Sequence, residues 1–196
     1  MKKRVSIIAL FLALICVFSG CSKITSLVGK DEAKTPVSEF LKAVKKDDTT
    51  SAKSCLVNPD DYESLTDVAK NVGLSDDNVE KFINEFTKIK YSVDSFTAGD
   101  DGQTGTVIVT MTIPDYAPAF TDALSKIDAK ASSEASLKTI METLANYTPV
   151  AVQKAVAVNV VKSNDKWLID YSNNNIELLN AVNGNLLSSL HGFLSV

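Results

Sequence analysis

The hydrophobic pattern of this 196-residue chain predicts an α+β fold, in which an antiparallel sheet of about four strands packs on N-terminal helices. Apolar residues recur every three to four positions between 35 and 86, as on the buried face of a helix. They alternate with polar residues at 89–93, 106–113 and 152–161, as in half-buried strands. Because polar turns join these strands in consecutive pairs, we expect hairpins and therefore antiparallel pairing.

Three helices are expected before the first strand. Thr35 and Pro36 start the first, because threonine accepts hydrogen bonds from free amide groups and proline suits the first helical position. Asn58-Pro59 repeats this signal for the second helix, whose C-terminal cap is Gly73, and Ser75 starts the third. The expected buried positions are Val37, Phe40, Leu41 and Val44, then Tyr62, Leu65, Val68, Ala69 and Val72, and finally Val79, Phe82, Ile83 and Phe86.

The first hairpin has an interruption in each strand. Phe96 breaks the alternation of the first strand, which predicts a β-bulge near Asp94–Ser95. Residues 98–105 form the connecting loop, and Pro114 is expected to end the returning strand. The second hairpin turns at 162–166, and one face of its last strand carries Trp167, Ile169 and Tyr171.

A helical insert at 115–147 separates the two hairpins, and a C-terminal helix follows the second. The weak join at 131–133 leaves open whether the insert is two helices or one bent helix. We expect the insert to cover the sheet; the alternative is a docking surface for another protein, because it is rich in alanine and serine. Gly184 is the weak point of the C-terminal helix, whose apolar positions are Leu179, Val182, Leu186, Leu190 and Phe193.

The first 20 residues have the composition of an export signal. Lys2, Lys3 and Arg4 precede an uncharged, mainly apolar run at 5–18, and small residues follow it. This run has 14 residues. A membrane-spanning helix needs about 20, so we prefer a cleaved signal to an uncleaved span.

The end of this signal resembles the lipobox of bacterial lipoproteins. The residues are Phe18-Ser19-Gly20-Cys21, with Phe18 where that family usually has leucine. The resemblance implies cleavage between Gly20 and Cys21 and lipid on the Cys21 sulfur, which would anchor the protein at the extracytoplasmic face of the cell membrane. Each buried methylene contributes about 0.8 kcal/mol, so two or three acyl chains would hold it firmly. The predicted organisation is a signal peptide at 1–20, a lipidated tether at 21–34 and a single domain at 35–196.

Charge and cysteine content exclude several classes of protein. Removal of the leader would leave 17 basic and 24 acidic residues, and such a surface repels nucleic acid. Cys16 would leave with the leader and Cys21 would carry lipid, so Cys55 would remain alone and the domain would have no internal disulfide. We interpret Cys55 as a small buried hydrophobic residue rather than a nucleophile.

Two segments resemble nuclear-transport-factor-two-like domains, which are also called cystatin-like or ketosteroid-isomerase-like. They are the patterned helix at 37–48 and the strand around Trp167, and the resemblance covers 35–171. Small bacterial lipoproteins of unknown function often have such domains. The resemblance implies a curved sheet wrapped around helices into a cone, which is an enzyme pocket in some members and only a binding concavity in many. The insert and the C-terminal helix depart from the commonest form of the family.

Candidate catalytic groups are scarce. One histidine, His191, and no usable cysteine pair exclude a conventional zinc site, and we expect no cofactor. The family's isomerases use an acid and a tyrosine, and the available pairs here are Asp115-Tyr116 and Asp170-Tyr171. Neighbours in a strand point to opposite faces, so Asp170 and Tyr171 cannot enter one cavity, and Asp115-Tyr116 is expected to begin a helix.

The sequence therefore predicts a lipid-anchored, non-enzymatic module that binds a small apolar ligand or an envelope protein. The alternative is an enzyme of the isomerase or dehydratase kind, acting on a small hydrophobic substrate in the cone. Trp167 is expected in the core rather than as a ligand platform. A cone filled by side chains would argue against the enzyme, whereas a closed cavity with converging polar groups would support it.

Overall fold

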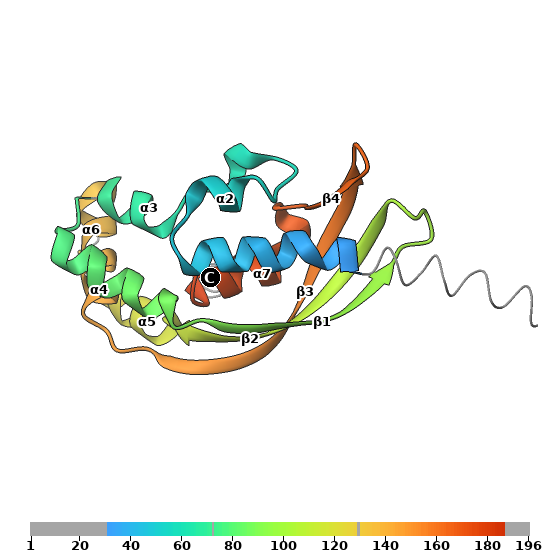
Figure 1. Ribbon diagram of the computed structural model, residues 1–196. Helices are drawn as coiled ribbons and strands as arrows, with labels where there is room; N and C mark the ends of the chain where they lie inside the picture. Colours follow the sequence, from blue (N-terminus) through green and yellow to red (C-terminus); the bar gives the residue numbers. More distant parts are fainter. Residues whose placement is uncertain (1–30, 72, 129, 187–196) are drawn as a thin grey trace, which may run out of the picture.

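A computed structural model of the chain describes residues 31–71, 73–128 and 130–186, and in this part the predicted α+β class is confirmed (Figure 1). Four strands form one curved antiparallel sheet in the order β1-β2-β3-β4. The N-terminal helix and α7 lie on the concave side of this sheet, and α3 to α6 gather at one end of it. The strands are β1 (Lys90–Ala98), β2 (Thr104–Asp115), β3 (Val150–Ser163) and β4 (Lys166–Ile169).

The N-terminal helix is described over residues 31–45, so it begins earlier than predicted. Thr35 does not cap it, because the Thr35 hydroxyl instead donates to the Asp31 carbonyl one turn earlier, at 2.9 Å. Ala33 is fully buried and extends the apolar stripe of Val37 and Phe40 by one turn, which explains the longer helix. The predicted tether thus overlaps the helix at 31–34, and its remainder lies outside the described residues.

The segment after this helix differs from the prediction of one helix beginning at Asn58. It contains α2 (Thr49–Lys53), a 3₁₀ turn (Pro59–Asp61) and then α3 (Leu65–Asn71). Ser64 caps the start of α3: its hydroxyl accepts from the Asp67 amide at 3.1 Å and donates to the Asp67 carboxylate at 2.8 Å. Tyr62 consequently lies in the link between the two turns, where it is buried.

The third predicted helix is confirmed as α4 (Asp76–Thr87), with Val79, Phe82 and Phe86 buried. Gly73 ends α3 as predicted, with a φ of 75° that favours glycine. The amide of the next residue, Leu74, donates back to the Ala69 carbonyl at 3.1 Å, which is the bond of a Schellman cap.

The first hairpin shows the predicted bulge, because the register of β1 against β2 shifts between Val93 and Ser95. Pro114 does not end β2 as expected; the strand continues to Asp115, and Pro114 pairs with Ala151 of β3. The ladder with β1 has already finished at Thr112, so β2 has no neighbour on that side at position 114. Proline is tolerated at such an edge because no ladder bond to β1 is lost.

The insert forms two helices, α5 (Ala117–Ser125) and α6 (Ser133–Ala145). Ser132 caps α6 by accepting from the Ala135 amide at 3.2 Å. The two helices pack on each other and α6 also packs on α4, so the insert closes one end of the sheet instead of covering its face (Figure 1). Leu137 of α6 is 41% exposed.

The second hairpin turns through Asn164 and Asp165, which both have positive φ. A second 3₁₀ turn (Asn173–Asn175) leads into α7 (Ile176–Val182), which is shorter than predicted. The break is at Gly184, whose φ is 62° and whose carbonyl accepts from the Tyr116 amide at 2.9 Å. A Cβ at Gly184 would come within 2.9 Å of the Tyr116 ring.

Several predicted features fall outside the described residues. They include the signal peptide, Gly20, Cys21 and the positions Leu190, His191 and Phe193. None of the helices within the described ranges is long and apolar enough to cross a membrane.

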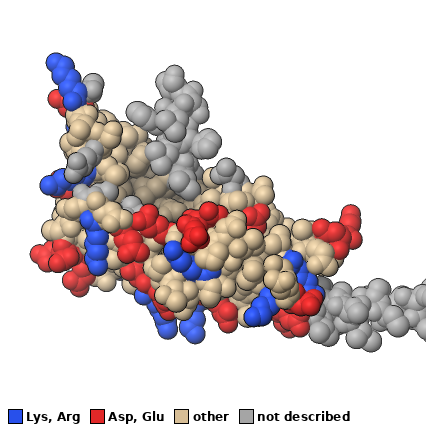
Figure 2. Space-filling view, turned by 90° about the horizontal axis from the view of Figure 1, so that it is seen from above, with Lys and Arg blue, Asp and Glu red and all other residues tan. Residues whose placement is uncertain are grey.

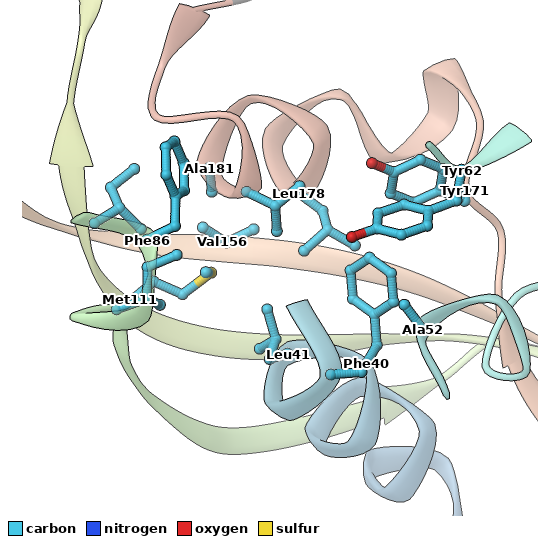
Figure 3. Close-up of a cluster of buried hydrophobic side chains, with 14 of the residues drawn as sticks. Phe40, Leu41, Ala52, Tyr62, Phe86, Met111, Val156, Tyr171, Leu178 and Ala181 are labelled. Carbon is cyan, nitrogen blue, oxygen red and sulfur yellow. The ribbon is translucent and has the colours of Figure 1, made fainter. Parts of the chain in front are cut away.

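The core lies between the concave face of the sheet and the helices above it (Figure 3). The sheet contributes alternate residues of β2 and β3, and helical side chains such as Leu41 and Leu178 fill the space between them. The rings of Phe40, Tyr62 and Tyr171 lie 5.6 Å from one another and join the N-terminal helix to the end of β4. The described strand residues with no exposed surface are Val107, Val109, Met111, Val156, Val158, Val160 and Ile169.

Candidate functional site

The concave side of the sheet, where the family resemblance places a cone pocket, is filled by side chains. Between this face and the helices, described residues line a small cavity with a volume of about 20 Å³. That is room for about one water molecule and not for an organic substrate. The residues that line it are Val44, Lys45, Asp47, Tyr62, Glu63, Leu65, Ile83, Phe86, Thr87, Val182 and Asn183.

Asp170 and Tyr171 diverge, as predicted from their adjacency. The Tyr171 ring is buried in the aromatic triad, its side chain hydrogen-bonds that of Asn183, and burial raises the pKa of its hydroxyl to about 12. The Asp170 carboxylate instead accepts from the Asn174 amide group at 3.1 Å, in an exposed contact. The two groups therefore cannot act on one substrate as acid and base.

Asp115 and Tyr116 have structural roles at the junction of β2 and α5. The Asp115 carboxylate accepts from the Ala117 amide at 3.2 Å and from the Asn185 side chain at 3.1 Å. The Tyr116 ring stacks on Phe86, with centroids 5.6 Å apart and planes 8° apart. Burial raises the pKa of the Tyr116 hydroxyl, so this side chain stays neutral.

Cys55 is a free, buried cysteine, as predicted. Its Sγ donates to the Ser51 carbonyl at 3.4 Å, and burial raises the pKa of the thiol. A higher pKa lowers the fraction of thiolate, which is the nucleophilic form. In the described part of the chain, no three histidine, cysteine or acidic side chains are grouped closely enough to hold a metal ion.

An open groove of about 510 Å³ lies where the N-terminal helix, the segment after α2 and strand β4 meet. We call it the end groove, because it lies at the end of the sheet where the chain enters the domain (Figure 1). Three acidic residues and one lysine line it, so its charge favours a neutral or cationic occupant. Its lining residues are Glu32, Thr35, Pro36, Glu39, Ser54, Cys55, Asp165, Lys166, Trp167 and Leu168.

Trp167 contributes aromatic surface to the end groove. The indole packs edge to face against Phe96 with ring centroids 5.3 Å apart, and the side chain is only partly buried. The prediction of a core position is thus half correct: one side of the ring packs on the core and the residue also borders the groove. The sequence pattern indicated which face of the strand carries Trp167, but not that this residue borders the end groove.

The backbone beside the end groove is tied together by a short contact that the sequence did not reveal. The Val57 amide donates to the Ile169 carbonyl at 3.0 Å, and the Ile169 amide donates to the Cys55 carbonyl at 2.9 Å. Residues 55–57 thus cover the outer edge of β4. This contact fixes the groove wall that contains Cys55 against the wall that contains Trp167.

A buried asparagine, which the sequence suggested only as part of a polar break, holds the next part of the sheet edge. Asn175 is 1% exposed, and its Oδ1 accepts from the Asn159 amide at 2.6 Å. Its Nδ2 donates to the Asn159 carbonyl at 2.8 Å and to the Asp170 carbonyl at 2.6 Å. The run of three asparagines at 173–175 was the signal available in the sequence.

Charged side chains of both signs are mixed on the surface of the domain. On the face shown in Figure 2, acidic and basic side chains are interspersed, and no continuous basic area covers it. The four ion pairs between described residues link side chains three or four positions apart. Such local surface pairs each contribute at most about 1 kcal/mol to the stability of the fold.

Comparisons with known proteins give little further information. No protein-family model and no curated protein sequence matches the chain. Among solved structures, the chain is similar to ycdA, a candidate lipoprotein of Bacillus subtilis, with 18% sequence identity. The match covers 69% of this chain and 45% of ycdA, so this chain corresponds to less than half the length of ycdA. The TM-score is 0.34, and a likeness at this level assigns neither fold nor function.

Proposed function

We propose that the chain is a lipoprotein, anchored by lipid on Cys21 at the extracytoplasmic face of the membrane, whose domain is a non-enzymatic binding module. The observation that carries this proposal is the basic start, short apolar run and Ser19-Gly20-Cys21 ending of the first 21 residues. The arrangement of the domain is compatible with it. The chain enters at the end formed by the two hairpin tips, so an anchored domain would hold α3 to α6 away from the membrane (Figure 1).

The filled concave face supports binding at the surface over catalysis inside the domain. A cavity of about 20 Å³ cannot admit the small hydrophobic substrate that the enzyme alternative requires. The end groove is large enough for a small apolar ligand or for a side chain of another envelope protein, and Trp167 would provide the contact. We also propose that the domain is nuclear-transport-factor-two-like, with a cone that is packed rather than hollow.

Lipid attachment is tested by metabolic labelling of cells with an alkyne fatty acid. The wild type and a Cys55→Ser variant should both be labelled and recovered with the membrane fraction, because Cys55 is a buried thiol. A Cys21→Ser variant should carry no label and should retain its leader. Labelling or processing of Cys21→Ser like the wild type would refute the anchor.

Ligand binding in the end groove can be followed through the only tryptophan of the chain. Titration with N-phenyl-1-naphthylamine, a neutral apolar probe, should change the Trp167 emission and increase the probe fluorescence. Trp167→Ala should weaken binding by about tenfold, corresponding to about 1.4 kcal/mol, whereas Tyr147→Phe, just after α6 at the opposite end of the sheet, should leave it unchanged. Equal binding by the wild type and Trp167→Ala would remove the groove from the proposal without affecting the anchor.

A further inference from the structure

Strand β3 has a covered half and an open half along the edge that faces away from β2. β4 pairs with residues 160–163, and the Asn175 side chain bonds both backbone groups of Asn159. The Glu177 carboxylate accepts from the Ala157 amide at 3.1 Å. Within the described ranges, nothing pairs with this edge at 151–155.

The direction of the free groups follows from strand geometry. Backbone groups alternate between the two sides of a strand, and those of Ala157 and Asn159 point to the outer edge. Ala151, Gln153 and Ala155 have the same parity, so their amide and carbonyl groups also point outward. All three residues are exposed, which leaves these donors and acceptors accessible.

The open half lacks the features that protect edge strands. β1, the opposite edge, has a bulge at Asp94, and the Lys34 ammonium donates to the Asp94 carbonyl at 3.2 Å. β3 pairs with β2 in unbroken register, and its one lysine in this half, Lys154, is turned to Asn185 at 3.2 Å. Exposed apolar side chains lie at both ends of the open half: Val150 is 67% exposed, and Ile176, next to Glu177, is 43% exposed.

We propose that a second copy of this chain pairs with the open half of β3, in antiparallel register symmetric about Gln153. Gln153 of one copy would lie opposite Gln153 of the other, and Ala151 of each copy would lie opposite Ala155 of the other. This arrangement would form about six backbone hydrogen bonds between the copies. The two four-stranded sheets would become one continuous sheet.

The ends of this register favour a second copy over an unrelated strand. The symmetry places Pro149, which has no amide hydrogen, opposite Ala157, whose amide is already bonded to Glu177. The pairing therefore stops where each strand runs out of free donors, without leaving an unpaired amide.

The side chains also tolerate the pairing. On the outer face the neighbours would be alanine with alanine and glutamine with glutamine. On the inner face, Val152 of one copy would lie opposite Lys154 of the other, and Val150 of one copy would lie opposite Val156 of the other. No like charges lie directly opposite each other in this register, and the exposed Val150 side chain would be covered.

Disulfide cross-linking of the full chain, in the cell fraction that holds the protein, tests the pairing. Gln153→Cys should form a disulfide-linked dimer under mild oxidation, because directly opposed residues lie within disulfide reach. Thr97→Cys, an exposed position on the β1 edge, is the matched control and should form about tenfold less dimer. Equal cross-linking at the two positions, a monomeric Gln153→Cys chain, or its capture by a different protein would overturn the proposal.

The register is tested by mixing two differently tagged chains. Ala151→Cys and Ala155→Cys should form a disulfide with each other, and neither should link to itself, because identical residues are separated in the symmetric register. Self-linked Ala151→Cys dimers at the level of the mixed dimer would overturn the register.

A proline at position 153 separates pairing from folding. Gln153→Pro removes an amide hydrogen that faces the open edge, so the ladder to β2 is kept, and edge strands accept such prolines. In the mixed Ala151→Cys and Ala155→Cys experiment, adding Gln153→Pro should reduce the disulfide by about tenfold, whereas Gln153→Ala should leave it unchanged. Circular dichroism melting verifies that both variants fold, and undiminished cross-linking by a folded Gln153→Pro chain would refute the model.

Discussion

The two halves of β3 show how one strand can be both fixed and exposed. At 157–163 each outward backbone amide has a partner, from β4, Asn175 or Glu177. At 151–155 the same kind of backbone faces outward with no partner among the described residues. The two halves share one unbroken ladder with β2, so the difference is due entirely to what lies on the other side.

Polar side chains provide this cover, and their positions explain why the cover stops. Strand β4 has only four residues, and the chain then turns through Asn173–Asn175 into α7. Asn175 and Glu177 bond the backbone amides of Asn159 and Ala157, the two outward-facing β3 residues next to the part that pairs with β4. After Glu177, α7 runs over the concave face of the sheet and no longer along its edge (Figure 1). Substitutions in the two halves should therefore change the free energy of unfolding by different amounts.

The largest effect is expected at Asn175, in the covered half. Asn175→Ala would leave the Asn159 amide without its partner. The carbonyls of Asn159 and Asp170 would each lose one bond and keep a backbone donor, the Asp170 amide at 3.3 Å and the Ser172 amide at 2.9 Å. A buried donor that loses its partner costs about 1–3 kcal/mol, and the two weakened carbonyls add to this, so we expect about 3 kcal/mol of destabilisation. Urea unfolding at neutral pH measures it.

Gln153→Ala in the open half is the matched control for Asn175→Ala. Its side chain is exposed, so the free energy of unfolding should change by less than about 0.5 kcal/mol. If the two substitutions destabilised the domain equally, the covered and open halves would not differ as the structure indicates.

The next effect compares two valines on the inner face of the same strand. Val156 is fully buried and Val150 is 67% exposed. Val156→Ala removes two buried carbon atoms and leaves a cavity, so it should cost about 2 kcal/mol, whereas Val150→Ala should cost less than about 0.5 kcal/mol. Thermal melting of the two variants gives the difference, and a larger loss at Val150 would indicate that this side chain is covered in solution.

Alkaline pH should weaken the part of the domain that packs against β4. Burial raises the pKa of Tyr171 to about 12, above the value of about 10 for an unfolded tyrosine. The neutral hydroxyl is favoured in the folded state, so this stabilisation is complete below pH 10 and is lost as the pH rises to about 12. Urea midpoints between pH 8 and 11.5 should fall above pH 10, and Tyr171→Phe should reduce the fall.

Sequence pattern predicted the parts of the fold that depend on periodicity and on a single residue's backbone preference. The four strands, the bulge near Asp94, the cap at Gly73 and the break at Gly184 follow from such local rules. The predicted start of the N-terminal helix was wrong because the apolar stripe continues for one turn before Thr35-Pro36. Ala33 lies in this turn, and its burial extends the helix.

The sequence did not predict how polar residues cover a sheet edge, because this depends on contacts between distant segments. Asn175 lies in a run of three asparagines, and Asn159 lies at a polar position within the alternating pattern of β3. Their bond joins positions 16 residues apart and requires the particular turn that ends β4. The end groove was equally hidden, since its walls come from residues 32–39, 54–55 and 165–168.

The smallest effect is expected at Glu177, which marks the boundary between the two halves. Its carboxylate is an exposed acceptor for the Ala157 amide, and water can replace it in Glu177→Ala. The free energy of unfolding should therefore fall by less than about 1 kcal/mol. Glu177→Gln keeps an acceptor at the same position, so the free energy of unfolding should fall less still. Hydrogen exchange at the Ala157 amide is the direct measurement, because it should become faster in Glu177→Ala and remain slow in Glu177→Gln. Unchanged exchange in Glu177→Ala would mean that the covered half already ends at Asn175.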